Sequence, residues 1–234
     1  GVANDQLGAT VDAPDMYIRS VGDFNGDGID DLLVGARSRE DSHGGAYLIL
    51  GKDGAQPGTP DLDLSTFVSG STTGMRMKGH TSYSHAGDAV GGGGDFNGDG
   101  FKDIIIGSGK HGGMRGIAHV IYGHNATMRP FEDIYLGAFG TGAAGFVIIG
   151  ATSDGMLGAA VSHAGDMNSD TFDDIIVCAP QEKVVALTGA GVCYVIFGKA
   201  VDFAENVDLA TFVFSASTGF KILGSDQGAS LGMS

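Results

Sequence analysis

Short runs of β-branched and aromatic residues alternate with Gly- and Asp-rich turns along the whole chain. Three equivalent runs, at residues 32–34, 104–106 and 175–177, consist only of Leu, Ile and Val. Such runs, bounded by turn residues, are typical of strands that are buried on both faces. Each is followed by an aromatic and aliphatic run, by a third run that ends in Gly, and by a run of small residues. The pattern predicts about four short strands per unit, separated by tight turns.

The units repeat along the chain with a period of about 72 residues. The segment GDFNGDGIDDLLVGA begins at Gly22, GDFNGDGFKDIIIGS at Gly94 and GDMNSDTFDDIIVCA at Gly165. A pattern of an apolar residue, Leu and Phe recurs at the same spacing, and its members are Leu62, Leu64 and Phe67; Ile134, Leu136 and Phe139; and Val207, Leu209 and Phe212. A fixed period of this length indicates a repeat architecture. We assign residues 1–234 to one repeat region, with approximate repeats 1–79, 80–150 and 151–224, and with 225–234 starting a further repeat.

Four-stranded units side by side predict an all-β fold, the β-propeller. A parallel β-helix is the weaker structural alternative, because its period would be shorter. Runs of small residues, such as Gly91 to Gly94 and Ala159 with Ala160, fit the innermost strand of a blade, where neighbouring blades crowd together.

Composition and charge argue against some classes of binding partner for this chain. The chain has 42 Gly but only 5 Pro, which fits a β protein with many turns. Its 28 acidic and 13 basic residues give a formal net charge of −15, and no basic cluster is present. We therefore expect no nucleic acid partner. The longest apolar stretch, residues 192–197, is far shorter than a membrane span, so we expect no membrane insertion by this segment.

The acidic loops that open each repeat carry the candidate chemistry. Oxygen-bearing side chains stand at positions 1, 3, 5 and 9 of each loop, and the carbonyl of position 7 can supply a fifth oxygen. The candidate metal ligands are Asp23, Asn25, Asp27, Ile29 and Asp31; Asp95, Asn97, Asp99, Phe101 and Asp103; and Asp166, Asn168, Asp170, Phe172 and Asp174. Ca²⁺ prefers six to eight such oxygens, whereas Mg²⁺ keeps its waters and demands a stricter octahedron. We expect about three calcium sites.

The sequence of these loops allows two other interpretations. An EF-hand would need a bidentate Glu at position 12, where this chain has Val34, Ile106 and Val177. Alternatively, the Asp and Asn side chains only cap the backbone of acidic turns. The third loop has Ser169 and Thr171 where the others have Gly, and a β-branched residue at positive φ costs about 1–2 kcal/mol. We therefore expect the third site to bind calcium most weakly.

The loop and the following strand motif together resemble the FG-GAP repeat, which builds the propeller of integrin α subunits. The similarity covers essentially the whole chain, and it implies calcium sites in the strand-connecting loops at one face of a propeller. A propeller has 4–8 blades, whereas this chain holds about three. We expect it to be part of a longer repeat protein, or a set of open blades completed by another copy.

Three further residues are candidate modification sites. Cys178 and Cys193 occupy small-residue positions on consecutive strands of one repeat, which predicts a cross-strand disulfide; two buried free thiols are the alternative. Asn125 begins the sequence Asn-Ala-Thr after a strand, which is a candidate N-glycosylation site.

No catalytic motif is present in the sequence, and we expect the protein not to be an enzyme. The pattern favours a secreted or cell-surface, non-catalytic, calcium-binding propeller that mediates adhesion to a protein or glycan ligand. One alternative is a structural subunit that assembles with further copies of itself through open blade edges. Another is an accessory module of a secreted enzyme.

Overall fold

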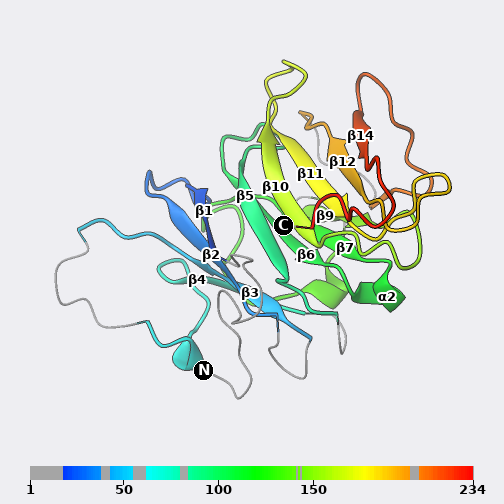
Figure 1. Cartoon of the computed structure of the whole chain (residues 1–234). Coiled ribbons are helices and arrows are strands. Elements are labelled where there is room, and N and C mark those ends of the chain that lie inside the picture. Colours follow the sequence, from blue (N-terminus) through cyan, green and yellow to red (C-terminus); the bar gives the residue numbers. More distant parts are fainter. Residues whose placement is uncertain are drawn as a thin grey trace.

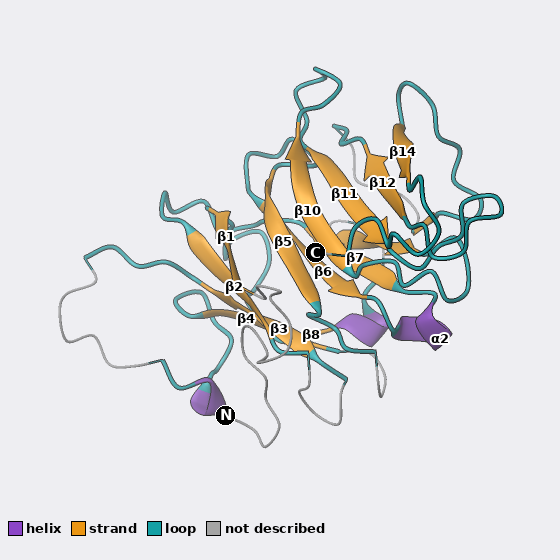
Figure 2. Ribbon diagram, viewed as in Figure 1, coloured by secondary structure: helices purple, strands orange, loops and turns teal. Residues whose placement is uncertain are grey.

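The computed structural model describes residues 18–37, 43–54, 62–79, 84–140, 142, 144–200 and 206–233. The start of the first predicted repeat, residues 1–17, lies outside them. Strands dominate, and the few helical turns are short (Figures 1 and 2).

The described residues form three sheets that follow one another along the chain, and their strands are antiparallel except for the parallel pairs β4–β8 and β9–β13. The first has the order β1-β2-β3-β4-β8, the second β13-β9-β7-β6-β5 and the third β10-β11-β12-β14. The strands of the first sheet are β1 (Ile18–Gly22), β2 (Asp31–Gly35), β3 (Gly45–Ile49), β4 (Gly74–Lys78) and β8 (Ile134–Tyr135). Those of the second are β5 (Ala89–Gly94), β6 (Asp103–Ser108), β7 (Ile117–Ile121), β9 (Gly145–Ile149) and β13 (Val207–Asp208). Those of the third are β10 (Ala160–Gly165), β11 (Asp174–Ala179), β12 (Val192–Ile196) and β14 (Gly219–Leu223).

In the part of the chain that the structure describes, three helical segments lie between strands. Two are 3-10 turns at equivalent places in their repeats, η1 (Leu64–Thr66) and η2 (Leu136–Ala138). The third, α2 (His111–Met114), is a single turn in which Gly112 and Gly113 have positive φ.

The first strands of the three sheets, β1, β5 and β10, lie side by side (Figure 1). The glycines of β5 make this approach possible. A side chain at Gly91 would come within 2.9 Å of the carbonyl oxygen of Val161 in β10, and one at Gly92 within 3.0 Å of Val21 in β1. The expectation that small residues line the crowded inner strand is confirmed.

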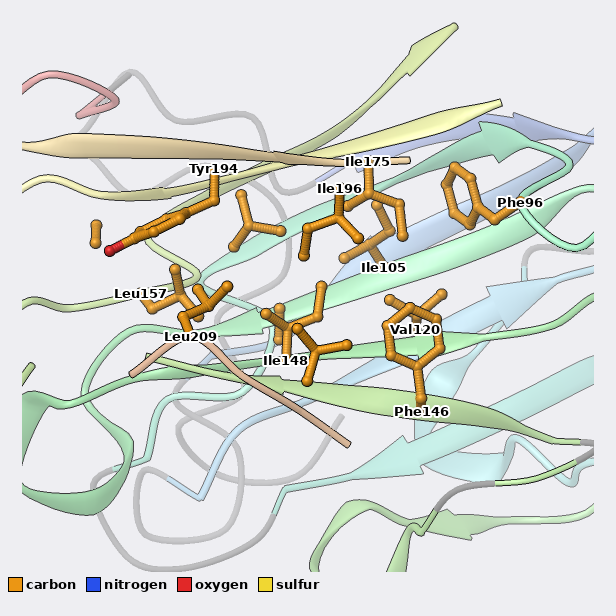
Figure 3. Packing of buried hydrophobic residues seen from close by; sticks show 14 of the residues in the cluster. Phe96, Ile105, Val120, Phe146, Ile148, Leu157, Ile175, Tyr194, Ile196 and Leu209 are labelled. Atoms are coloured by element: carbon orange, nitrogen blue, oxygen red, sulfur yellow. The ribbon is translucent and has the colours of Figure 1, made fainter. Parts of the chain in front are cut away.

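The two large core clusters lie between sheets, and a smaller one, made of Ala36, Tyr47 and Phe67, lies within the first repeat. One cluster joins the first and second sheets through Leu33, Met75 and Met77 on one side and Ile104 and Ile106 on the other. A second cluster joins the second and third sheets in the same way (Figure 3). In that figure Ile105, Phe146 and Ile148 of the second sheet face Ile175 and Ile196 of the third. Stacking of neighbours is therefore what buries the apolar face of each unit.

At each of the two contacts between neighbouring sheets, a short parallel strand also links one sheet to the next. β8 belongs to the second repeat but pairs with β4 of the first sheet, and β13 of the third repeat pairs with β9 of the second. These strands are the start of the repeated apolar-Leu-Phe segment, which thus reaches back to the preceding unit.

The all-β fold with blade-like sheets is confirmed. Each repeat forms its own four antiparallel strands in the order expected of a blade, and the three sheets do not close into a ring.

Candidate metal centre

The three acidic loops connect the first and second strands of each sheet and lie at the same end of the molecule (Figure 1). Each strand pair has a bulge where it enters the loop, between Ser20 and Gly22, Gly92 and Gly94, and His163 and Gly165. A bulge bends the strand and redirects the chain. The candidate ligands therefore sit on turns that are anchored at both ends by buried strands.

Within the first loop, the side chain of Asp23 organises the turn. Its Oδ1 accepts hydrogen bonds from the N–H groups of Gly26 at 2.6 Å and Asp27 at 3.0 Å, and its Oδ2 accepts one from Gly28 at 2.8 Å. Asp27 Oδ1 accepts from the N–H of Ile29 at 2.9 Å, and Asn25 Nδ2 donates to Asp27 Oδ2 at 2.9 Å. Positions 1, 3 and 5 are thus held on the concave side of one turn.

The second loop repeats these bonds. Asp95 accepts from Gly98, Asp99 and Gly100 at 2.7, 3.1 and 2.9 Å, and Asp99 accepts from Phe101 at 2.9 Å. The agreement between two loops with different neighbours indicates that the spacing itself dictates the turn.

The third loop has the same backbone conformation, although two of its residues are less suited to positive φ than glycine. Asp166 accepts from Asp170 and Thr171 at 3.0 and 2.9 Å. Ser169 and Thr171 have φ values of 62° and 79°, close to those of the glycines at the same positions in the other loops. The backbone strain on which the weaker third site was predicted is therefore present; the calcium affinities themselves stay a prediction.

The position-9 aspartates, Asp31, Asp103 and Asp174, are buried at the first residue of the second strand. Each spans two segments with its two oxygens. Asp31 accepts from the N–H groups of Phe24 and Gly51, both at 2.8 Å, and Asp103 accepts from Phe96 and Gly123, again both at 2.8 Å. These carboxylates therefore link the acidic loop by hydrogen bonds to the residues that follow the third strand of the sheet.

Burial raises the pKa of these carboxyl groups, although the backbone hydrogen bonds oppose it. The pKa of Asp31 rises to about 6, and that of Asp103 lies well above its usual range. The neighbouring loop carboxylates, Asp23 and Asp27 for Asp31, add to the rise by charge repulsion. A bound cation would relieve this repulsion.

Among the residues that the structure describes, no three His, Cys, Asp or Glu side chains are grouped so as to hold a metal ion. In each loop the carboxylates are instead turned toward backbone N–H groups. The donor set nevertheless fits a hard cation, since each loop offers carboxylate, amide and carbonyl oxygens and no nitrogen or sulfur. A carboxylate oxygen that accepts one hydrogen bond retains a further lone pair for a metal.

Contacts between successive loops were not expected from the sequence. The ring of Phe101 lies beside Gly26, where a Cβ atom would come within 2.5 Å of it, and Phe172 lies beside Gly98 in the same way at 2.3 Å. The N–H of Lys102 donates to the carbonyl of Asp23 at 3.1 Å, and that of Asp173 to Asp95 at 3.1 Å. The aromatic residue at position 7 of loops two and three was the available signal. The loops form a connected row.

The predicted cysteines and sequon fall on neighbouring elements. Cys178 of β11 and Cys193 of β12 stand opposite each other and are joined by a disulfide. Asn125 follows β7, and its Oδ1 accepts from the N–H and hydroxyl groups of Thr127 at 3.0 and 2.6 Å. Its glycosylation stays a prediction.

Hollows formed by described residues lie near this scaffold, and no sequence motif predicted the following two. One, of about 490 Å³, opens beside the first loop and is lined by Asn25, Asp27, Lys52 and Asp53 among others. The other, of about 400 Å³, lies between the second sheet and η2, with His111, Arg115, His119, Phe139 and Asn206 in its wall.

Comparison with known proteins agrees with this geometry. A family model described as "FG-GAP repeat" matches residues 20–48, which include the first acidic loop. The chain is 27% identical to integrin alpha-7 of Mus musculus over 231 residues and 30% identical to integrin alpha pat-2 of Caenorhabditis elegans over 191 residues. These alignments cover 94% and 78% of this chain, but only 16% and 14% of the two relatives. Integrin alpha-V of Gallus gallus is 26% identical over 193 residues.

The described part of the chain has no helix that is both long enough and apolar enough to cross a membrane.

Proposed function

Because the chain is an FG-GAP repeat protein that resembles the propeller of integrin alpha subunits, we propose that it is a calcium-stabilised, non-catalytic adhesion module that works outside the cell. The observation that carries the proposal is the threefold repetition of one acidic turn at one end of the sheets. Extracellular location is supported by the similarity to integrin alpha subunits and by the Cys178–Cys193 disulfide, which is typical of an oxidising compartment.

The proposed role of calcium is structural. An ion in each loop would be held by the carboxylates at positions 1, 5 and 9, the amide oxygen at position 3 and the carbonyl at position 7. It would offset the mutual repulsion of carboxylates such as Asp23, Asp27 and Asp31. Since each position-9 carboxylate also holds two backbone N–H groups, calcium would brace the loop against the sheet. Because successive loops contact one another, calcium bound in one loop would also stabilise the position of the next blade.

Ligand binding is proposed for the loop end of the sheets, where the hollow beside the first loop offers Asn25, Asp27 and Lys52. The ligand class, protein or glycan, is a proposal drawn from the relatives. It can be tested by presenting the chain to glycan arrays and immobilised matrix proteins, with calcium and with chelator. Binding that needs calcium supports the proposal, and no binding to either class under any condition counts against it.

The calcium role is tested by thermal unfolding in millimolar calcium and in excess chelator. We expect the melting temperature to fall by several degrees in chelator, because a ligand that binds only the folded state stabilises it. Asp27→Asn should remove part of this difference. Asp30→Asn, at the exposed position 8 of the same loop, should leave the difference intact. An equal melting temperature with and without calcium would contradict the proposal.

A further inference from the structure

The second repeat differs from its two neighbours at one pair of facing residues. In each sheet, the middle residue of the third strand stands opposite the middle residue of the fourth strand. The three pairs are Tyr47 with Arg76, His119 with Val147, and Tyr194 with Lys221. The first and third repeats therefore have a long cationic side chain opposite a tyrosine, whereas the second repeat has a short apolar side chain opposite a histidine.

The long side chains of the first and third repeats have partners on the surface of their own sheets. The Nε atom of Arg76 donates to Asp133 at 3.2 Å. The Nζ atom of Lys221 lies 5.2 Å from the ring centroid of Tyr194 and 5.0 Å from that of Phe214. These side chains therefore occupy a part of the sheet surface that a shorter residue leaves open.

The hollow of about 400 Å³ lies at the equivalent place in the second repeat. Val147 and Ile149 of β9 line it, and their equivalents in the first repeat are Arg76 and Lys78. The shorter side chains of β9 thus account for the space. Its volume is within the range of sites that bind small molecules.

Segments from two repeats build the wall of this hollow. β7, β9 and η2 belong to the second repeat, and Asn206 belongs to the third. α2, which contributes His111, connects the second and third strands of the sheet, whereas the acidic loop connects the first and second (Figure 1). The hollow therefore lies toward the end of the sheet opposite to the acidic loops, away from the candidate calcium ligands.

His119 lines the hollow without filling it. Its side chain is only 1% exposed, and its Nε2 lies 3.2 Å from the carbonyl oxygen of Leu136. Because a carbonyl oxygen can only accept, Nε2 carries the hydrogen of this bond. The ring also packs edge-on against Phe139, with 5.9 Å between centroids. These contacts hold the imidazole against η2.

Two polar side chains in the wall are positioned as hydrogen-bond donors. Arg115 donates from Nε to the carbonyl of Gly150 at 2.5 Å and from Nη2 to Asp208 at 2.6 Å. A guanidinium has five N–H donors, so Arg115 has donors beyond these two bonds. Asn206 accepts from the N–H of Val147 at 3.0 Å through its Oδ1, which leaves its NH₂ group as the donor that it offers to a ligand.

The wall is better suited to an anionic ligand than to a cationic one. In the first repeat the cation Arg76 is paired with Asp133, the residue immediately before β8. The equivalent residue before β13 is Asn206, so an amide stands where a cation would need a carboxylate. The positive charge of Arg115 is also part of the wall, and it is balanced in part by Asp208.

We propose that this hollow binds a small carboxylic acid with a compact apolar body. The body packs against apolar side chains such as Ile117, Val147 and Phe139, which line the hollow. The carboxylate accepts hydrogen bonds from the N–H donors of Arg115 and Asn206, and the bond from the guanidinium is charge-assisted. This site goes beyond the adhesion function proposed above and does not depend on it.

The test is an NMR titration of the whole chain in calcium that observes the methyl groups of Val147 and Ile149. Phenylacetate is the probe and phenylacetamide is its uncharged analogue, while benzoate and 3-methylbutanoate vary the shape of the apolar body. We expect saturable shifts, and a dissociation constant for phenylacetate roughly tenfold lower than that for phenylacetamide, because hydrogen bonds to charged groups are the stronger ones. No saturable shift with any of these carboxylates, or equal affinity for phenylacetamide, would overturn the proposal.

Variants that fill the hollow test where the probe binds. Val147→Phe and Ile149→Phe each add apolar volume without adding charge, and each should raise the dissociation constant of phenylacetate roughly tenfold or more. Val185→Phe, at a position that is 91% exposed and outside the hollow, is the matched control and should bind as the wild type does. Unchanged melting temperatures in calcium would show that the variants fold, and binding that neither filling variant weakens would overturn the proposal.

The role of Arg115 has a separate readout. Arg115→Gln should weaken the binding of phenylacetate roughly tenfold and that of phenylacetamide much less, because only the carboxylate gains from the guanidinium charge. The ratio of the two affinities is informative because a general loss of structure would weaken the binding of both probes alike. A ratio that Arg115→Gln leaves unchanged would contradict the assignment of Arg115 to the carboxylate.

Discussion

At the residue scale, the acidic loops depend on a few positions where backbone conformation and packing act together. Gly26 and Gly28 both have positive φ, yet only Gly26 lies against another side chain, the ring of Phe101. An added Cβ at Gly28 would have nothing within 4 Å. Comparing substitutions at the two glycines therefore distinguishes the free-energy cost of the left-handed conformation from the free-energy cost of crowding.

We expect Gly26→Ala to destabilise the protein more than Gly28→Ala. Both changes place a Cβ at positive φ, at a cost of about 1–2 kcal/mol. Gly26→Ala must also displace the Phe101 ring, which adds about 1–3 kcal/mol. Urea unfolding in excess chelator measures the difference without a metal contribution. Equal free energies of unfolding would show that the loops do not pack on one another as described.

In the third loop the opposite substitution, from a residue with a side chain to glycine, can be made. Thr171 has a φ of 79°, and its equivalents in the other loops are Gly28 and Gly100. We expect Thr171→Gly to stabilise the protein by about 1 kcal/mol, since glycine adopts this conformation without strain. The reverse change in the second loop, Gly100→Thr, should destabilise by a similar amount. Thermal unfolding of both variants tests the pair, and a Thr171→Gly protein that melts lower would refute the argument.

At the element scale, the short strands β8 and β13 are what the sequence explains least. The apolar-Leu-Phe pattern is visible as a repeat, but nothing in it shows that its first residues pair with the preceding sheet. That pairing depends on the distance between two sheets, which a periodic pattern does not contain. By contrast, the runs at 32–34, 104–106 and 175–177 predict β2, β6 and β11 well, because burial on both faces leaves an unbroken apolar signature.

An ion-pair cluster holds β8 in place. Asp133, immediately before β8, contacts Arg76 and Lys78 of β4 and accepts from the Ser69 hydroxyl at 2.6 Å. Burial would raise the pKa of Asp133, but the hydrogen bonds from Arg76, Ser69 and Lys78 outweigh it and lower the pKa below its usual range.

Removal of this charge should therefore have a pH-dependent effect. A carboxyl group whose pKa is lowered on folding contributes stability above its unfolded pKa of about 3.9, and that contribution is lost as the pH falls below this value. We expect Asp133→Asn to cost about 1 kcal/mol at pH 7, with the difference from wild type shrinking below about pH 4. The neighbouring exposed change Glu132→Gln should cost little at any pH. Urea unfolding from pH 7 to pH 3 measures both, and a cost for Asp133→Asn that does not vary with pH would contradict this role.

At the scale of the whole molecule, the repeat period is the sequence feature that predicts most of the fold. Three units with the same markers predict three similar sheets, and conserved spacing within the acidic turns predicts three loops at one end. The sequence does not show how units are joined, because the core residues of each joint come from two repeats, as Met77 and Ile104 do. It also does not show that Phe101 and Phe172 link one loop to the next.

We propose that the three acidic loops bind calcium as structural sites. Equilibrium dialysis of the whole chain against radioactive calcium tests it most directly, because it counts bound ions and ranks their affinities. We expect about three ions per chain, two bound more tightly than the third, and we expect Thr171→Gly to tighten the weakest site. A chain that binds no calcium at millimolar concentration would contradict it.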